Sequence, residues 1–378
     1  SFNLSSSTVV GGFGNLNAKG NIALNDGTFG LASGSSNGNL ILNGTAAQNV
    51  SLGATTVATV QNLTVSNNAG VSFSGTNTFN VQGDVSFGNV NNATISAAGK
   101  LKLISNENFT GRVADITNNG VNSGNTISGD VIVERYIPLG KRAFRFLTPG
   151  VSTTNFILNN WQLGTHITGS TTVANGFDIT STGNPSMYTY NNQATSGTGW
   201  TAIANTDVTD LIAGRGYRLL VRGDRNVDLN VASQDNMNNP VTLSAKGSLL
   251  TGSVTFDATS NIAINNTTNT TTADYSLIGN PYVSSVDWHN VIKTGIEDSY
   301  YAWDANLGTS TERGRYVVYS QTLGSSSIQN GTGSTNIGRY LQSGQAFFVK
   351  NTTTGVAGSL TFNENNKVNN QLNVFRTN

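Results

Sequence analysis

Short runs of alternating apolar and polar residues dominate residues 1–133, and each run is typical of a short β-strand with one buried face. The apolar pairs of these runs are Ile22/Leu24, Leu40/Leu42, Val50/Leu52, Leu63/Val65, Val71/Phe73, Phe79/Val81, Val85/Phe87 and Leu101/Leu103. From Leu63 onward a strand starts roughly every 6 to 9 residues, so three strands form a unit of about 22 to 25 residues. This period predicts a β-solenoid, that is, a parallel β-helix-like stack of coils over residues 1–133. A sandwich of meandering hairpins is the alternative.

Residues 134–378 change to longer strands that are rich in aromatic residues, and they contain all four tryptophans of the chain. The predicted strands are Ala143–Leu147, Met187–Tyr190, Tyr217–Val221, Ser253–Phe256, Tyr275–Ile278, Ser299–Trp303, Tyr316–Tyr319 and Ala346–Lys350. Helical signal is nearly absent, with at most one short turn or helix over Val286–Ile292. Since aromatic side chains bury large areas, these strands predict a thicker core, as in an antiparallel β-sandwich or jelly-roll-like domain.

The second region also repeats itself. Each copy has an aromatic strand, a second strand, and then a Gly-rich turn into an aromatic-apolar strand. The first copy consists of Met187–Tyr190, Gly199–Trp200 and Ala213–Val221, and the second of Tyr300–Trp303, Arg315–Tyr319 and Ser343–Lys350. The repeat predicts two similar halves, about 134–250 and 251–378, whose sheets face each other. Chance similarity among Gly- and Tyr-rich strands is the alternative.

Composition supports an all-β protein and removes several functional classes. Asn, Ser, Thr and Gly supply most of the polarity, and these residues favour strands and turns over helix interiors. Only 11% of residues are charged, 20 basic residues balance 20 acidic ones, and cysteine is absent. Without a basic stripe we expect no nucleic-acid partner, and no apolar run reaches the roughly 18 to 20 residues of a membrane span. The polar start at Ser1 is not that of a signal peptide, so we expect a mature or trimmed chain.

Several segments combine into a distinctive set of motifs. They are Gly44–Val50, Val60–Asn67, Gly129–Pro138, Arg142–Leu147, Ile278–Tyr282, Val286–Trp288 and Leu341–Val349. Together they resemble the large repetitive cell-surface and secreted proteins of the Bacteroidetes, over most of the chain from about residue 40. The resemblance implies export through a type IX secretion system, an extracellular or cell-surface location, and a role in adhesion, gliding or extracellular structure. It supplies no catalytic residues.

Side chains that could carry chemistry are few. The two histidines are His166 and His289. Asp287 lies two residues before His289, but this short local motif does not predict a catalytic dyad, and no Gly-x-Ser-x-Gly motif occurs. The carboxylates of residues 1–110 are Asp26, Asp84 and Glu107, too far apart for the acidic groove of a polysaccharide-cleaving solenoid. The segment Asp224–Asp228 has the outline of a calcium loop without the full set of oxygen ligands. We therefore predict no enzyme activity, no catalytic residue, no metal site and no cofactor.

Two groups of residues are candidates for binding. The aromatic residues Tyr188, Tyr190, Tyr301 and Trp303 are a candidate platform for stacking sugars, with packing into the core as the alternative. The candidate self-assembly strands hold Thr8, Val9 and Val10 near the start and Leu372, Val374 and Phe375 near the end. We expect a non-enzymatic structural or adhesive surface protein, which joins copies of itself head to tail or binds surface glycans. The alternative is a carbohydrate-binding accessory region of a secreted polysaccharide-acting enzyme.

Overall fold

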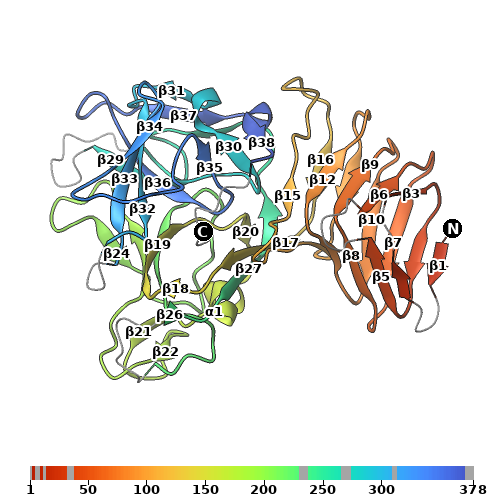
Figure 1. Cartoon of the computed structure of the whole chain (residues 1–378), viewed down its shortest axis with the longest axis horizontal. Coiled ribbons are helices and arrows are strands. Elements are labelled where there is room, and N and C mark those ends of the chain that lie inside the picture. The colour runs from red at the N-terminus through yellow and green to blue at the C-terminus, as the bar shows by residue number, and fades with distance from the viewer. Residues whose placement is uncertain are drawn as a thin grey trace.

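The protein is described by a computed structural model over residues 2–4, 9–11, 14–31, 38–229, 237–264, 274–308 and 313–370. Within these residues regular structure is almost entirely β, as predicted, and the α-helix α1 (Trp161–Gly164) has four residues. Figure 1 shows two parts: a stack of short strands with the N-terminus at its outer end, and a wider part built from the rest of the chain.

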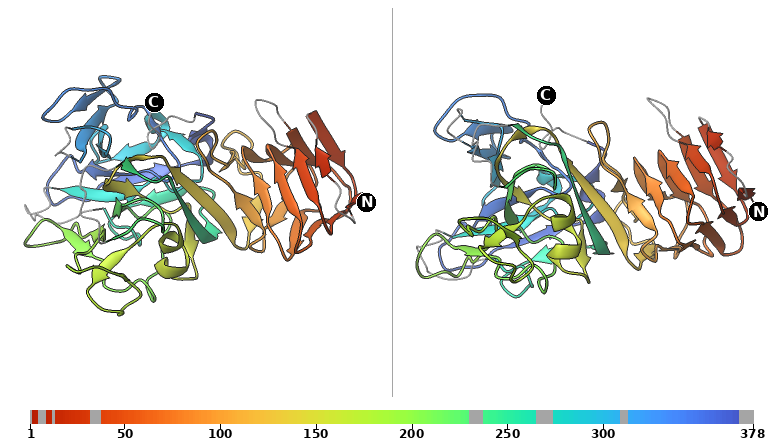
Figure 2. Two further views of the ribbon diagram at one scale, coloured as in Figure 1. Left: turned by 60° about the horizontal axis from the view of Figure 1, so that its bottom comes forward. Right: turned by 90° about the horizontal axis from the view of Figure 1, so that it is seen from below.

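The N-terminal part is a β-solenoid of about four turns, in which three parallel sheets run along the stack (Figure 2). The first sheet holds β1 (Phe2–Leu4), β4 (Ile22–Leu24), β7 (Gln48–Leu52), β10 (Val71–Gly75), β13 (Thr94–Ser96) and β16 (Thr126–Ser128). The second holds β2 (Val9–Gly11), β5 (Thr28–Leu31), β8 (Val57–Val60), β11 (Phe79–Val81), β14 (Leu101–Leu103) and β17 (Val131–Ile137). The third holds β3 (Gly14–Ala18), β6 (Gly38–Leu42), β9 (Asn62–Val65), β12 (Asp84–Phe87) and β15 (Arg112–Val113). The predicted solenoid is thus confirmed.

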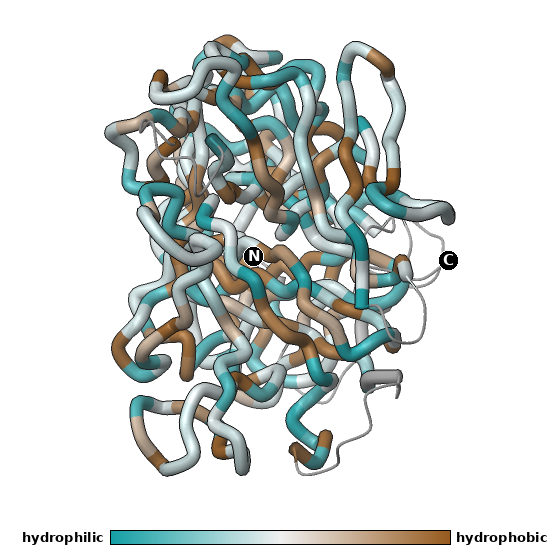
Figure 3. The backbone as a smooth tube through the Cα atoms, turned by 90° about the vertical axis from the view of Figure 1, so that its left-hand side faces the viewer, coloured by the Kyte–Doolittle hydropathy of each residue, from teal (hydrophilic) through white to brown (hydrophobic). Residues whose placement is uncertain are grey.

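The register of these sheets stacks like residues on like. Leu40, Leu63 and Val85 lie in one column on successive strands of the third sheet, and all three are fully buried. Figure 3, in which the wider part faces the viewer, shows hydrophobic and hydrophilic residues interspersed along the backbone. Asparagines form a ladder on the same sheet: the Asn39 amide donates to Asn15 Oδ1, and the Asn62 amide donates to Asn39 Oδ1, each at 2.7 Å. Apolar columns inside and amide ladders outside therefore hold the coils together.

The solenoid joins the wider part through a shared sheet. Its last strand, β17, crosses the predicted boundary at residues 133/134 and pairs antiparallel with β27 (Val241–Leu249), which pairs in turn with β20 (Val151–Thr153). The Val113 N–H also donates to the Val283 carbonyl at 2.8 Å. One buried apolar cluster runs from Ile22 to Val283, so the two parts share a continuous core.

Two antiparallel sheets in the wider part have the same strand order. The first holds β19 (Ala143–Leu147), β25 (Tyr217–Val221), β23 (Met187–Tyr190) and β24 (Trp200–Ala202). The second holds β29 (Tyr275–Gly279), β36 (Ala346–Lys350), β32 (Ser299–Asp304), β33 (Arg315–Ser320) and β34 (Ser325–Ile328). In the first sheet β19 pairs with β25, and β25 pairs with the aromatic strand β23. In the second sheet β29 pairs with β36, and β36 pairs with the aromatic strand β32. This common topology matches the repeat seen in the sequence.

Short elements complete the wider part. Two of them are strand pairs: β18 (Gly140–Lys141) with β26 (Met237–Asn238), and β21 (Thr168–Ser170) with β22 (Asp178–Ile179). In a first three-stranded sheet β37 (Ser359–Phe362) lies between β28 (Val254–Phe256) and β31 (Ile292–Thr294). In a second one β30 (Ser285–Asp287) lies between β35 (Tyr340–Leu341) and β38 (Lys367–Val368). The 3-10 helices are η1 (Ile157–Asn159), η2 (Trp288–Asn290) and η3 (Glu364–Asn366). The η2 helix lies inside the segment predicted to form one short turn or helix. Only the β21–β22 pair is parallel among the strand pairs described in this part.

Candidate functional site

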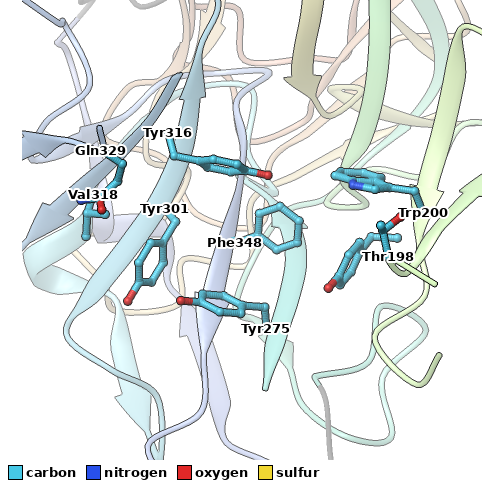
Figure 4. Close-up of a pocket in the computed structure, with 9 residues that line it drawn as sticks. Thr198, Trp200, Tyr275, Tyr301, Tyr316, Val318, Gln329 and Phe348 are labelled. Atoms are coloured by element: carbon cyan, nitrogen blue, oxygen red, sulfur yellow. The ribbon is translucent and has the colours of Figure 1, made fainter. Parts of the chain in front are cut away.

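A pocket of about 350 Å³ lies where the two repeated sheets approach each other (Figure 4). Its lining residues are Tyr190, Thr198, Trp200, Tyr275, Tyr301, Tyr316, Val318, Gln329 and Phe348. Six of these nine side chains are aromatic. The first sheet and the turn before β24 contribute one wall, and the second sheet and Gln329, the residue after β34, contribute the other.

Strand pairing explains why the rings gather here. Tyr190 and Trp200 lie directly opposite each other in the β23–β24 pair. Tyr301 and Phe348 lie opposite each other in the β32–β36 pair. Because directly opposite residues of an antiparallel pair project from the same face, each sheet presents two neighbouring rings to the pocket.

Phe348 forms the floor of the pocket and is 6% exposed. Its ring centroid lies 4.8 Å from that of Tyr190, 5.8 Å from that of Trp200 and 6.1 Å from that of Tyr275, each time close to perpendicular. Phe146 supports this floor, since its ring lies 5.5 Å from both Trp200 and Phe348. Edge-to-face contacts of this kind favour a fixed arrangement of the rings.

Hydroxyl groups give the pocket a polar rim. The Tyr301 hydroxyl donates to Glu297 Oε2 at 2.9 Å, and Glu297 Oε1 pairs with Lys350 Nζ at 2.8 Å. Burial raises the pKa of Tyr190 to about 12, and burial also raises the pKa of Tyr316. Burial, followed by the hydrogen bond to Glu297, raises the pKa of Tyr301. These hydroxyls therefore stay protonated at neutral pH, and the Tyr301 oxygen, whose proton goes to Glu297, can accept a hydrogen bond from a ligand.

The pocket has the size and character of a small-ligand site. Such sites span about 300 to 1,000 Å³ and combine apolar or aromatic walls with a few polar groups that orient the ligand. The half-exposed rings of Tyr190, Trp200, Tyr275 and Tyr316 offer flat apolar surface beside hydroxyl donors. This arrangement has room for a ring-shaped ligand with an apolar face and polar edges.

The residues of the predicted sugar platform divide into two pairs. Tyr190 and Tyr301 line the pocket. Tyr188 lies on the same strand as Tyr190 but outside the lining, and Trp303 packs behind the pocket with its ring 4.9 Å from Tyr316. Of the two strands that hold the predicted platform, β23 and β32, each therefore contributes one platform residue to the pocket.

Sequence reasoning missed the other aromatic lining residues, which are Trp200, Tyr275, Tyr316 and Phe348. All four belong to strands that the sequence predicts or to the second strand of the repeat. The usable signal was the repeat itself, because the pocket takes aromatic residues from strands of both repeated sheets.

Neither histidine belongs to the pocket. His166 Nδ1 lies 3.5 Å from Asp178 Oδ2. His289 Nε2 lies 2.7 Å from the Tyr319 hydroxyl, and the Asp287 carboxylate accepts a hydrogen bond from the backbone N–H of His289 instead of from its ring. No cluster of three or more His, Cys, Asp or Glu side chains suited to a metal ion occurs within the described ranges.

The candidate self-assembly residues are only partly described. Val9 and Val10 belong to β2, where they pair in parallel with Thr28 and Phe29 of β5. Thr8, Leu372, Val374 and Phe375 lie outside the described residues. In the described part of the chain β2 is the outermost strand of its sheet, as are β1 and β3 of theirs.

Fold and pocket together define an all-β protein with a parallel solenoid and a pocket lined by aromatic residues. The sequence model of a domain of unknown function, DUF8693, matches residues 167–378, and the chain therefore belongs to the DUF8693 family. This match includes every residue that lines the pocket and leaves out the solenoid. No curated protein and no solved structure matches the chain. None of the helices described in the structure is both long and apolar enough to cross a membrane.

Proposed function

We propose that this chain is a non-enzymatic adhesive or structural protein that binds saccharides in its aromatic pocket. The observation that carries the proposal is the pocket between the two repeated sheets, with its aromatic walls and protonated hydroxyl rim. Aromatic rings bind the apolar face of a sugar, and hydroxyl groups bind its edges. We interpret the two repeated sheets as the halves of a β-sandwich that holds these walls at a fixed distance.

The solenoid suits the role of a spacer in such a protein. Its apolar columns and amide ladders make a stiff rod, and its shared core with the wider part fixes the direction of that rod. The resemblance to large surface proteins of the Bacteroidetes supports an extracellular or cell-surface location for this arrangement. Low charge also suits a surface whose stability changes little with salt.

The alternative is that the same pocket serves as the binding region of a secreted enzyme that acts on polysaccharides. Both versions require saccharide binding, and they differ in whether the bound saccharide is cleaved. Incubation of the purified chain with the polysaccharides that it binds, followed by size analysis, separates them. Unchanged polymer length supports the adhesive version, whereas new reducing ends support the enzyme.

Substitution of Trp200 tests the proposal itself. We expect the wild-type chain to bind members of a glycan microarray and to titrate with the best of them in calorimetry. Trp200→Ala removes one wall and is expected to weaken binding by at least about tenfold, the effect of losing about 1.4 kcal/mol. Tyr340→Ala is the matched control, because Tyr340 is a half-exposed aromatic residue outside the pocket. The proposal is wrong if no glycan binds, or if both variants bind like the wild type.

The outer strands of the solenoid favour self-assembly as a second candidate function. β1, β2 and β3 end their three sheets in the described part of the chain, and Val9 and Val10 lie on this edge. An exposed strand edge pairs readily with a strand of another chain. Light scattering of the full chain and of a variant that lacks residues 371–378 tests the idea. Monomers in both cases at high concentration would exclude head-to-tail assembly.

A further inference from the structure

An arginine lies beside the pocket, stacked among aromatic rings. The guanidinium carbon of Arg218, on β25, is 3.9 Å from the ring centroid of Phe144, 5.0 Å from that of Trp200 and 5.7 Å from that of Tyr188. Trp200 also lines the pocket, so its ring borders both the guanidinium and the pocket. Arg218 lies directly opposite Phe146, the residue that supports the pocket floor.

Two further arginines continue this row away from the pocket. Arg142 directly precedes Ala143 and Arg222 directly follows Val221, and Ala143 and Val221 are the last paired residues of the β19–β25 ladder. Arg142 and Arg222 therefore lie at the same end of that ladder. Arg222 lies four positions after Arg218 in the sequence, about 13 Å along an extended strand. We call Arg142, Arg218 and Arg222 the arginine strip.

The arginine strip has no carboxylate at ion-pair distance among the residues that the structure describes, although the charge of Asp178 acts on Arg222. None of its three side chains takes part in an ion pair there. Arg222 is only 7% exposed; its Nη1 donates to Thr168 Oγ1, while its Nε has no hydrogen-bond acceptor within the described ranges. Burial and the nearby charge of Arg142 lower the pKa of Arg222 to about 10, against the opposing charge of Asp178, so Arg222 remains charged at neutral pH. Like charges held together in a partly buried place disfavour the fold unless an anion joins them.

We propose that the saccharide site extends from the pocket onto the arginine strip, and that the strip binds the acidic groups of an anionic saccharide. This inference rests on the proposed saccharide binding in the pocket. Arginine suits the task because its planar fork binds carboxylate or sulfate groups with two parallel hydrogen bonds. Stacking on Phe144 and Trp200 holds the Arg218 guanidinium in place before the ligand arrives. The ligand class is thus an oligosaccharide that carries carboxylate or sulfate groups, with an uncharged sugar face in the pocket.

Matched pairs of polymers test the inference. We would measure the affinity of the wild-type chain for polygalacturonate and for its fully methyl-esterified form, and for dextran sulfate and dextran. In each pair only the acidic groups differ, so the first pair reports on carboxylate and the second on sulfate. We expect the acidic member of at least one pair to bind about tenfold tighter or more, as charge-assisted hydrogen bonds predict, and we expect added salt to reduce the difference.

Variants of Arg218 then test whether this residue causes the preference for the acidic polymer. Arg218→Gln is expected to abolish the preference for the acidic polymer, and Arg218→Lys, which keeps the charge but not the planar fork, to retain part of it. Lys100→Gln, in the solenoid, removes one positive charge far from the pocket and should leave the preference unchanged. Circular dichroism of each variant checks that it is folded.

Three results would overturn the inference. Equal affinity for acidic and neutral members of both pairs would show that the arginine strip binds no acidic group. An unchanged preference in Arg218→Gln, or an equal loss in Lys100→Gln, would show that the preference arises from overall charge. In these cases the pocket proposal stands if Trp200→Ala still weakens glycan binding. If the wild-type chain binds no glycan at all, both proposals are wrong.

Discussion

A buried ion pair joins the end of the solenoid to the wider part, and its removal should destabilise the whole chain. Lys367 Nζ lies 2.6 Å from Glu364 Oε2, and the two side chains are 2% and 1% exposed. Glu364 also accepts hydrogen bonds from the backbone N–H of Ile116 at 3.2 Å and of Gly252 at 2.9 Å. One carboxylate therefore holds the last solenoid coil, the ammonium group and a loop of the wider part.

Glu364→Gln keeps the shape of the side chain but leaves the buried ammonium without its negative partner. Removal of one partner of a buried ion pair typically costs about 3 to 5 kcal/mol. Lys367 retains the Tyr282 ring at 4.7 Å and a weak hydrogen bond to the Ala114 carbonyl at 3.4 Å. We therefore expect a loss near the lower limit, about 3 kcal/mol in the free energy of unfolding.

Urea unfolding, followed by circular dichroism and by tryptophan fluorescence, measures this loss. The double variant Glu364→Gln/Lys367→Met removes the unpaired charge and should recover much of the stability. Lys102→Gln is the control, because the Lys102–Glu134 pair is partly exposed and its loss should cost less than about 1 kcal/mol. The reasoning is refuted if Glu364→Gln costs no more than Lys102→Gln, or if the double variant is less stable than Glu364→Gln.

Three further predictions concern the solenoid and the pocket. Gly75→Ala should destabilise the protein by about 1 to 3 kcal/mol, because Gly75 has φ +98° and an added Cβ would lie 2.1 Å from the Leu52 carbonyl oxygen; an unchanged urea midpoint would contradict this. Asn39→Ala removes two rungs of the amide ladder and should lower the free energy of unfolding by about 1 to 3 kcal/mol, whereas equal melting temperatures would show that the ladder adds no stability. The fold favours the neutral phenol of Tyr190, because the pKa of this residue is raised to about 12. The contribution of the Tyr190 phenol to stability should therefore be complete below about pH 10 and should fall between about pH 10 and 12. Phenolate absorbance that rises fully by about pH 10 in the folded chain would contradict this prediction.

Local pattern predicted the strands well where one face is buried. The bounds Ala143–Leu147, Met187–Tyr190, Tyr217–Val221 and Ala346–Lys350 agree with those of the structure, because alternation with period two identifies a half-buried strand directly. The solenoid followed from the same signal repeated at a nearly constant spacing.

Long-range pairing could not be predicted in this way. The strand β27 alternates like its neighbours, but nothing local to Val241–Leu249 indicates that it pairs with β17, more than a hundred residues earlier in the chain. The ion pair of Glu364 with Lys367 also gains its role only from the distant backbone of Ile116. The same holds for the pocket, where the rings of Trp200 and Phe348 lie 5.8 Å apart although more than a hundred residues separate them in the chain.

The central claim is that the aromatic pocket between the repeated sheets is a saccharide site. A crystal structure of the chain with the oligosaccharide that binds best on the microarray tests this claim most directly. We predict a sugar ring in the pocket, with its apolar face against Trp200 or Tyr190 and a hydroxyl within hydrogen-bond distance of a tyrosine hydroxyl of the rim. An oligosaccharide bound elsewhere on the chain, with the pocket empty, would contradict the claim.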